Sequence, residues 1–337
     1  MRWPSRLFVL LLAVGMLWAG VGLAEEQNDV EVHWGTDRLV EYRVGELPII
    51  LVIPHDGSRS PGDIPNRTRG IRGADRHAMA YGLRVYELLH ERTGRRPHLV
   101  ICHLHRRKVD VNRDVDEAAQ GSEAAERTWS EFHGFIEQAK EKVAEAHEHG
   151  HLFDLHTMGR SAAVEIGHLL TRARLSADDD ELNTDANRRR TSLRALVERS
   201  PLDLADLVRG PKSIGALLEE RDIPTIPSPE RPAPTGAFYS GGYITQRHGS
   251  HRGGTVDATQ VEGNRTRLNN AEYREKFSQA LAESILEFMK EHYDLEVQED
   301  AEARGNVLPE PQQLVCLLVL TAVIEGRRHR GKFRRQE

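Results

Sequence analysis

Short apolar runs rich in β-branched residues alternate along the chain with longer segments of helical periodicity. The apolar runs predict strands at residues 47–54, 98–105, 150–156, 223–226 and 256–262. The periodic segments predict helices at residues 75–93, 122–149, 192–198, 213–221 and 270–292. Strands and helices that alternate in this way are typical of sheets built from βαβ units. The pattern predicts an α/β fold: a single three-layer domain with a mixed, mostly parallel sheet and helices on both faces.

Two stretches between these elements have an irregular pattern. Residues 172–190 are highly charged and rich in Asp and Asn, which predicts a loop. Residues 223–236 are rich in proline, which predicts an extended segment on the surface. Neither a repeat nor an interdomain linker is visible.

The N-terminal segment has the layout of a targeting signal. Arg2 and Arg6 precede an apolar run over residues 7–23, and the small residues Gly22 and Ala24 stand at its end, before an acidic stretch. This order predicts a signal peptide over residues 1–24 and an exported protein, whether periplasmic, secreted or at the cell surface. An uncleaved membrane anchor is the alternative, because the run is close to the lower limit for a membrane span.

The C-terminal segment also has an unusual order. Pro309, Glu310 and Pro311 precede an uncharged apolar run over residues 314–324, and a basic terminus follows. This order resembles the PEP-CTERM sorting signal of exported bacterial proteins, and a short amphipathic tail is the alternative. We therefore expect a catalytic domain over residues 25–300 and a tail over residues 301–337 that sorts the protein to a membrane or surface.

Charge and composition exclude several classes of protein. The 337 residues hold 46 Lys and Arg against 52 Asp and Glu, and the body at residues 25–313 holds 38 against 50. An acidic body argues against a nucleic-acid partner held by bulk positive charge. Cys102 and Cys316 are too few for a disulfide scaffold or a cysteine metal cluster. The chain contains neither a G-x-S-x-G nucleophile elbow nor a P-loop.

Polar residues with metal-binding chemistry follow the predicted strands. His55 comes directly after the first strand, His156 ends the third, and Asp75 begins the helix that follows the first strand. Two histidines and one carboxylate form a common catalytic zinc set, with a fourth position left for water. Each residue also has a structural alternative: a hydrogen-bonded histidine, or a helix N-cap for Asp75. Asp154 lies two residues before His156, on the same strand face, where it can orient that imidazole.

Further candidates could bind a substrate. Asn112 and Arg113 follow the second predicted strand, and the Arg113 guanidinium suits a carboxylate. A surface ion-pair cluster of Asp110, Arg113 and Asp114 is the alternative. Further along, Gly241 and Gly242 permit a tight backbone, next to the pocket candidates Tyr243, Arg247 and His248.

Glu262 ends the last predicted strand. A buried glutamate there is costly unless it is used or paired. Beside a metal-bound water it would act as a general base. Paired with Arg265 or Arg267 it would be structural.

These motifs, PHDG, Asp75, VDVNRD, FDLHTM, GGYITQRHG and ATQVEGNR in this order, resemble the N-formylglutamate amidohydrolase family over residues 45–290. The resemblance implies a zinc-carboxypeptidase-like fold, also shared with aspartoacylase-type deacylases. It further implies Zn²⁺ bound by His55, Asp75 and His156, and Glu262 as the residue that activates water. Asn112 and Arg113 match the pair that grips a substrate carboxylate, and the segment with Gly242 and Tyr243 lines the pocket. Arg247 is our candidate for stabilising the oxyanion.

Two departures from the family pattern affect these expectations. Position 58 is Ser, where zinc carboxypeptidases have a glutamate three residues after the first histidine, and the acidic stretch after VDVNRD has no match in the family. We expect a small-molecule or peptide substrate with a free carboxylate and a zinc-dependent cleavage of an N-acyl amide. The alternatives are an exported zinc carboxypeptidase or amidase on peptides or cell-wall fragments, and a non-catalytic binding protein. The oligomeric state stays open.

Overall fold

The structure is a computed structural model that describes residues 30–297. The described residues up to Leu295 belong to one compact unit. The expected signal peptide, the expected C-terminal tail and Cys316 lie outside the described residues, whereas Cys102 is a buried free thiol. Within residues 30–297, none of the helices has the length and apolar character that crossing a membrane requires.

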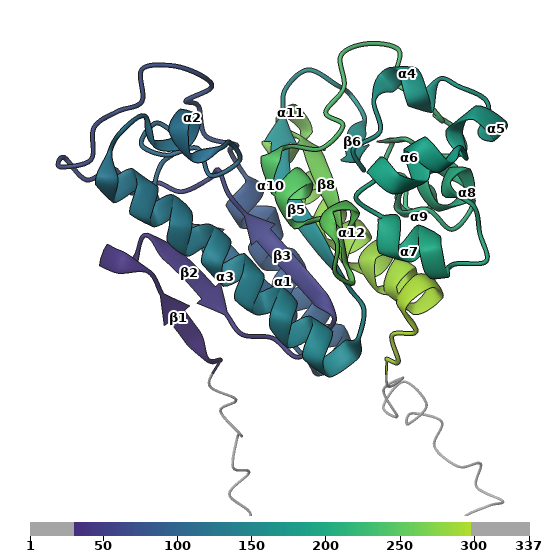
Figure 1. The fold of residues 1–337 in the computed structure, drawn as a ribbon, viewed down its shortest axis with the longest axis horizontal. Coiled ribbons are helices and arrows are strands. Elements are labelled where there is room, and N and C mark those ends of the chain that lie inside the picture. Colours follow the sequence, from purple (N-terminus) through teal and green to yellow (C-terminus); the bar gives the residue numbers. More distant parts are fainter. Residues whose placement is uncertain (1–29, 298–337) are drawn as a thin grey trace, which may run out of the picture. The chain divides into compact units, whose positions relative to one another are not determined.

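An eight-stranded mixed sheet forms the centre of this unit (Figure 1). Its spatial order is β1-β2-β4-β3-β5-β8-β6-β7. The pairs β3/β4, β3/β5, β5/β8 and β6/β7 are parallel, and β1/β2, β2/β4 and β6/β8 are antiparallel. The predicted mixed, mostly parallel sheet is confirmed. The strands are β1 (Val32–Trp34), β2 (Val40–Arg43), β3 (Ile49–Ile53), β4 (His98–Cys102), β5 (Gly150–Met158), β6 (Val164–Gly167), β7 (Thr225–Ile226) and β8 (Val256–Asn264).

Long helices cover both faces of the sheet. Helix α3 (Glu123–His147) packs on the face that carries Ile50 and Leu152, and it crosses in front of the strands in Figure 1. Helix α1 (Ala78–Thr93) packs on the other face, where Gly82 approaches Ile53 and Leu155 closely. Neighbouring residues of a strand point to opposite faces, so the two helices enclose the sheet. Helix α12 (Ala271–Tyr293) packs beside α1. The predicted three layers are confirmed.

The prediction of a loop at residues 172–190 is wrong. This stretch contains the short helices α4 (Arg172–Leu175), α5 (Asp179–Leu182) and α6 (Asp185–Arg190). The Thr171 and Asp178 side chains cap α4 and α5, and Leu175 and Leu182 are buried. Caps and buried leucines therefore outweigh the charge density that suggested a loop.

The remaining helices are one or two turns long. They are α2 (Val115–Ala119), α7 (Arg194–Arg199), α8 (Leu204–Arg209), α9 (Ile214–Glu219), α10 (Tyr243–His248), α11 (Arg265–Leu268) and the 3-10 helices η1 (Thr36–Arg38) and η2 (Ser250–Arg252).

The apolar pattern does not predict β1, β2 and β6. These strands are three or four residues long, and β2 and β6 contain the buried charges of Glu41 and Glu165. Each charge has a partner from another segment: His103 lies 2.7 Å from Glu41 and Arg160 lies 2.9 Å from Glu165. Ion pairing lets these glutamates occupy buried strand positions that a hydrophobicity pattern excludes.

Candidate metal centre and its cavity

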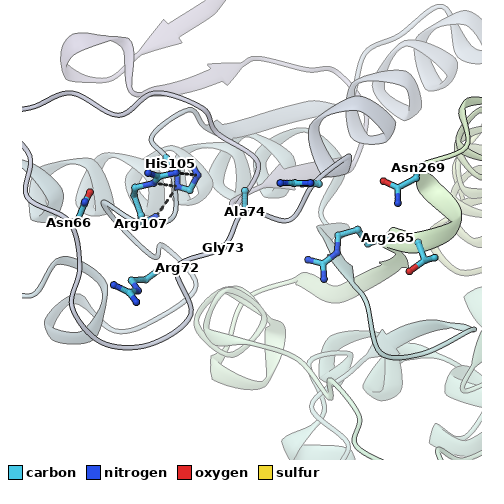
Figure 2. A pocket seen from close by; sticks show the side chains of 10 residues that line it. Asn66, Arg72, Gly73, Ala74, His105, Arg107, Arg265 and Asn269 are labelled. Atoms are coloured by element: carbon cyan, nitrogen blue, oxygen red, sulfur yellow. Dashed lines mark hydrogen bonds between the residues drawn. The ribbon is translucent and has the colours of Figure 1, made fainter.

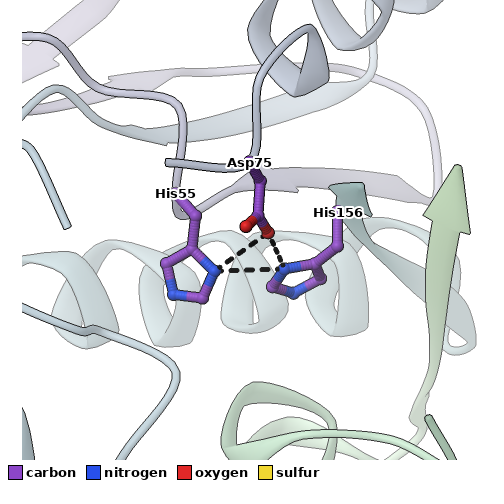
Figure 3. Close-up of side chains that lie close together, drawn as sticks. All are labelled: His55, Asp75 and His156. Carbon is purple, nitrogen blue, oxygen red and sulfur yellow. Dashed lines mark hydrogen bonds and ion pairs between the residues drawn. The ribbon is translucent and has the colours of Figure 1, made fainter. Parts of the chain in front are cut away.

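Two histidines and one aspartate meet at the carboxyl ends of the central parallel strands (Figure 3). His55 follows β3, His156 lies in the neighbouring strand β5, and Asp75 lies in the loop before α1. The His55 Nδ1 atom lies 3.2 Å from both His156 Nδ1 and Asp75 Oδ2. His156 Nδ1 lies 2.9 Å from the same Asp75 oxygen. Three potential ligand atoms thus point at one another.

The backbone around Asp75 explains why its side chain is available. The Asp75 N–H donates a hydrogen bond to the His55 carbonyl at 3.0 Å, which ties the loop to the end of β3. Helix α1 begins at Ala78, and the Asp56 carboxylate accepts the Met79 N–H at 3.0 Å in its first turn. The alternative role of Asp75 as the N-cap is therefore wrong, because Asp56 serves this helix end.

The outer nitrogen of each imidazole faces a second carboxylate. His55 Nε2 lies 2.8 Å from Asp110 Oδ1, and His156 Nε2 lies 2.9 Å from Asp154 Oδ1. Asp110 and Asp154 are fully buried. The expected contact of Asp154 is present, whereas the contact of Asp110 was not expected. The Asp110 carboxylate places the single proton of a neutral His55 imidazole on Nε2. In contrast, neither Asp154 oxygen forms a hydrogen bond in the described part of the chain, and His156 Nε2 also lies 3.4 Å from Asn112 Nδ2.

With its proton on Nε2, His55 presents the Nδ1 lone pair to Asp75 and His156. The inner atoms of His55, His156 and Asp75 lie 2.9–3.2 Å apart, so a shared proton or a bound cation has to offset the repulsion between their lone pairs. Zinc bonds nitrogen and oxygen at about 2.0–2.2 Å, which separates the ligands of a tetrahedral set by about 3.3 Å. The donor set and its spacing therefore fit a zinc ion.

Charge interactions in the cluster lead to the same conclusion. Burial lowers the pKa of His156, but the neighbouring charges of Asp154 and Asp75 outweigh burial and raise it well above the usual value. Burial raises the pKa of Asp75, yet the charges and hydrogen bonds of His55 and His156 lower it far below its usual range. The cluster thus attracts positive charge strongly, whether the charge is a proton or a metal ion.

Glu262 lies beside this cluster on β8. It is paired in register with His156 of β5, on the same sheet face, and is 5% exposed. Burial raises the pKa of Glu262 to about 7, against the opposing effect of His156. The Gln260 amide donates a hydrogen bond to Glu262 Oε1 at 2.7 Å. Neither Arg265 nor Arg267 forms an ion pair with Glu262 within the described residues, so the structural alternative for Glu262 is wrong.

A cavity of about 410 Å³ opens over these groups. The candidates Asn112, Arg113, Gly242 and Tyr243 all line it, together with Asp75, His156 and Glu262. Arg247 does not line it: its guanidinium lies over the Trp129 ring at 5.1 Å and its Nη1 donates to the Tyr243 hydroxyl at 3.3 Å. Arg106 lies in the cavity wall together with Arg113.

Arg106 was not among the candidates. Its guanidinium donates to Asp75 Oδ1 and to Asp110 Oδ2, each at 3.0 Å. It therefore joins the inner carboxylate to the carboxylate that orients His55. The sequence offers one signal for it, the i,i+4 spacing of Arg106 and Asp110 just after a strand.

Asn112 has a structural task in addition to its place in the cavity wall. Its Oδ1 accepts the backbone N–H of Ile244 at 2.8 Å, in the first turn of α10. Gly242 packs directly on this amide, since a Cβ at position 242 would lie 2.4 Å from Asn112 Nδ2. Asn112 therefore fixes the segment that carries Tyr243.

The alternative of a surface ion-pair cluster of Asp110, Arg113 and Asp114 is wrong. Asp110 is buried beside His55, and Asp114 caps α2 by accepting the N–H groups of Asp116 and Glu117. Arg113 Nε lies 3.3 Å from Glu117 and its Nη1 donates to the Asn112 carbonyl at 2.6 Å. The half-buried Arg113 is thus anchored at the cavity wall.

His248 lies behind the cavity wall. It is fully buried on α10, and its ring nitrogens lie 2.8 Å from His133 Nδ1 and 2.8 Å from Glu137 Oε1, both on α3. His133 in turn lies 3.0 Å from the Val111 carbonyl. This chain of polar contacts attaches α10 to α3, so His248 supports the cavity from outside.

Comparisons with known proteins find structural likenesses only. A scan against protein-family models and a search of curated proteins find no match. A gene product from Agrobacterium tumefaciens is 14% identical, with a TM-score of 0.46 over 77% of this chain and 99% of its own. An N-formylglutamate amidohydrolase from Ralstonia eutropha is 14% identical, with a TM-score of 0.43 over 73% and 97%. A candidate carboxypeptidase from Burkholderia mallei is 11% identical, with a TM-score of 0.34 over 75% and 60%. Because all three scores lie below 0.5, the site rests on its own geometry.

Proposed function

We propose that this chain is a zinc-dependent amidohydrolase that cleaves the N-acyl amide of an amino acid or another small substrate with a free carboxylate. One observation carries the proposal: candidate ligand atoms of His55, Asp75 and His156 converge within 4.8 Å of one another beside the buried carboxylate of Glu262. A cation centre next to a general base is the arrangement that metal-dependent amide hydrolysis requires.

His55, Asp75 and His156 would hold the metal. Two imidazole nitrogens and one carboxylate oxygen favour zinc over magnesium or calcium, which prefer oxygen ligands. When bound by three protein ligands, zinc supplies a Lewis acid that activates water near neutral pH and polarises a carbonyl group. Asp110 keeps the His55 imidazole in the tautomer that presents Nδ1, and Asp154 lies 2.9 Å from His156 Nε2.

Glu262 would move the proton. Its carboxylate accepts a proton from the attacking water and returns it to the leaving nitrogen. The hydrogen bond from Gln260 leaves Glu262 Oε2 free to turn toward the cavity. A buried carboxyl with a raised pKa is a suitable base, since proton transfer is most efficient when the pKa is near the working pH.

Arg113 would bind the substrate carboxylate, with Asn112 and Tyr243 beside it. We assign to Arg106, in place of Arg247, the stabilisation of negative charge on the substrate carbonyl, because Arg106 lies in the cavity wall and contacts Asp75. From the N-terminal segment we also propose that the enzyme acts outside the cytoplasm.

Metal analysis and Glu262→Gln test this proposal together. The purified full chain should bind about one zinc ion, and chelation should abolish release of free amine from N-formyl, N-acetyl and C-terminal peptide substrates until zinc is restored. Glu262→Gln should keep zinc and lose about 10²–10⁴-fold in kcat. A chain that binds no zinc, or a Glu262→Gln variant with normal turnover, contradicts the mechanism. Zinc without turnover on any substrate would favour the binding protein.

A further inference from the structure

A second cavity lies directly beside the metal centre. It holds about 770 Å³, against about 410 Å³ for the cavity over the metal ligands. Figure 2 shows Arg72, Arg107 and His105 on one side of it and Arg265 and Asn269 on the other. Arg76 also lines it. Four arginines therefore surround one hollow in a protein whose body is acidic.

These arginines have no acidic partners. Among residues 30–297, none of the four guanidinium groups lies within 4.0 Å of a carboxylate oxygen. The arginines of the neighbouring cavity differ, since Arg106 pairs with Asp75 and Asp110. The positive charge of the second cavity is thus uncompensated, and it attracts anions into the hollow.

The walls of this cavity are held in place by a buried arginine. The 2%-exposed Arg67 donates from Nη1 to the Ile71 carbonyl at 2.7 Å and to the Arg106 carbonyl at 3.3 Å. The backbone N–H of Arg67 donates to the Arg107 carbonyl at 2.7 Å. One buried side chain therefore joins the segment before Arg72 to the segment that carries Arg107. The cavity is shaped before any ligand arrives, which lowers the entropic cost of binding.

The two cavities share their walls. In the segment before α1, Asp75 lines the cavity over the metal ligands and Arg76 lines the second cavity. In the segment after β4, Arg106 lines the cavity over the metal ligands and Arg107 lines the second cavity. Thr157, which follows His156 on β5, donates a hydrogen bond to the Arg76 carbonyl at 3.1 Å. The two cavities therefore adjoin along these two segments.

We propose that the cavity formed by Arg72, Arg76, Arg107 and Arg265 binds an acidic stretch of a peptide substrate whose amide bond lies over the metal centre. The inference names the substrate class of the proposed amidohydrolase and rests on that function. Planar guanidinium groups match carboxylates in geometry, and several of them spaced around a hollow suit a chain with several carboxylates. Inorganic phosphate has the same charge complementarity, so the experiment must separate it from the peptide.

Arg107 is oriented for this task by a neighbour. Its backbone N–H and its Nε both donate to His105 Nδ1, at 3.0 and 3.4 Å. Arg265 is placed by close packing instead, since a Cβ at Gly159 would lie 2.7 Å from its Nη2. Both guanidinium groups are therefore positioned by the fold, from the two sides of the cavity.

Binding of a fluorescein-labelled tetraglutamate peptide to the full chain tests the proposal, because binding needs neither zinc nor turnover. The chain should bind this peptide with or without chelator, should not bind the tetraglutamine analogue, and should lose affinity as salt rises. Replacing Arg72, Arg107 and Arg265 by Gln should weaken binding by about 100-fold. Replacing Arg127, Arg172 and Arg190 by Gln removes the same net charge elsewhere on the chain. This control should change the affinity for the tetraglutamate peptide by less than about threefold.

Three results would overturn the proposal: equal weakening in both triple variants, tight binding of tetraglutamine, or binding of inorganic phosphate without binding of the peptide. A hydrolysis assay adds a second readout. The Arg72, Arg107 and Arg265 variant should raise KM for N-formyltetraglutamate by about tenfold or more, with kcat/KM for N-formylleucine within about twofold of wild type. If wild type hydrolyses neither compound, the proposed function fails, while the binding result still decides this cavity.

Discussion

The strands β5 and β8 carry two buried polar clusters, one at each end and on opposite faces of the sheet. At the carboxyl end lie His156 and Glu262. At the amino end lie His151 and Asp257, which are also paired in register. Both histidines are almost fully buried. Burial of a histidine in a strand therefore does not by itself distinguish a metal ligand from a structural residue.

The amino-terminal cluster satisfies all its hydrogen bonds internally. Thr259 lies 2.7 Å from His151 Nε2, and His151 Nδ1 lies 2.8 Å from the Tyr293 hydroxyl. Tyr293 and Ser250 then donate to Asp257. Because hydroxyl groups both donate and accept, each proton in this chain has an acceptor. Burial lowers the pKa of His151 well below its usual value, which keeps the ring neutral.

The carboxyl-terminal cluster contains no hydroxyl between its inner atoms. His55 Nε2 lies 2.8 Å from Asp110, His156 Nε2 lies 2.9 Å from Asp154, and the inner nitrogens of both rings converge with Asp75. The two clusters therefore differ in whether a hydroxyl group lies between the converging nitrogen and oxygen atoms. Matched substitutions at the two ends of the strands test this contrast.

The largest effect is expected from substituting the two histidines of β5. His156→Ala should lose zinc, with affinity at least about 10³-fold weaker and turnover at background, because one of three protein ligands is missing. His151→Ala should keep zinc but lose about 2–4 kcal/mol in the free energy of unfolding, through a cavity and two unsatisfied hydroxyls. Metal analysis after dialysis and urea unfolding measure the two outcomes. Retention of zinc by His156→Ala would remove it from the ligand set.

A smaller effect is expected from the carboxylate behind His55. Asp110→Asn should weaken zinc affinity by about 10–100-fold, since the amide holds the imidazole tautomer less firmly. Excess zinc should restore most of the activity. Asp114→Asn is the control, because Asp114 caps α2 and, although it lines the same cavity, its side chain accepts hydrogen bonds from Asp116 and Glu117 and not from the candidate ligands. If both variants bind zinc as wild type does, Asp110 has no role in the metal centre.

Gly242→Ala tests the support of the substrate side of the cavity. The added Cβ would overlap the Asn112 amide, so the start of α10 must shift. We expect kcat/KM to fall by about tenfold while zinc is retained, because displaced contact residues misplace the substrate. Gly236→Ala, at a position with nothing within 4 Å of the added Cβ, should keep kcat/KM within about twofold of wild type. A larger loss in the control would point to general destabilisation.

The smallest effect is a pH dependence at the amino-terminal end. Burial raises the pKa of Asp257 to about 6 in the folded protein, from a usual value near 4. The folded state therefore binds more protons than the unfolded state in this interval, and the stability due to Asp257 is lost as pH rises through it. From about pH 5 to about pH 7 the loss is about 1 kcal/mol.

Thermal unfolding of Asp257→Asn measures this effect. The variant cannot ionise, so its melting temperature relative to wild type should increase from about pH 5 to about pH 7. Zinc content should not change. A difference in melting temperature that stays constant with pH would show that Asp257 does not titrate in this range.

The amino-acid pattern was sufficient to predict the long elements and the polar residues at strand ends. Periodicity predicted α3, α12 and most of β3, β5 and β8, because buried faces repeat at fixed intervals along a helix or strand. It also gave His55, Asp75, His156 and Glu262 as polar residues at such ends. It could not predict the charged strands β2 and β6, whose buried glutamates pair with His103, which is 62 positions away, and with Arg160, which lies in the loop before β6.

The contacts between side chains at the site could be seen only in the tertiary structure. His55 contacts Asp110 across 55 positions and His156 across 101, and such contacts leave no periodic trace in the chain. The sequence pattern likewise gives no sign that Arg106, and not Arg247, lies in the cavity wall, or that several arginines surround the second cavity. Local patterns determine which face of a helix or strand is buried, whereas the partners of a buried polar side chain depend on which distant residues the fold places beside it.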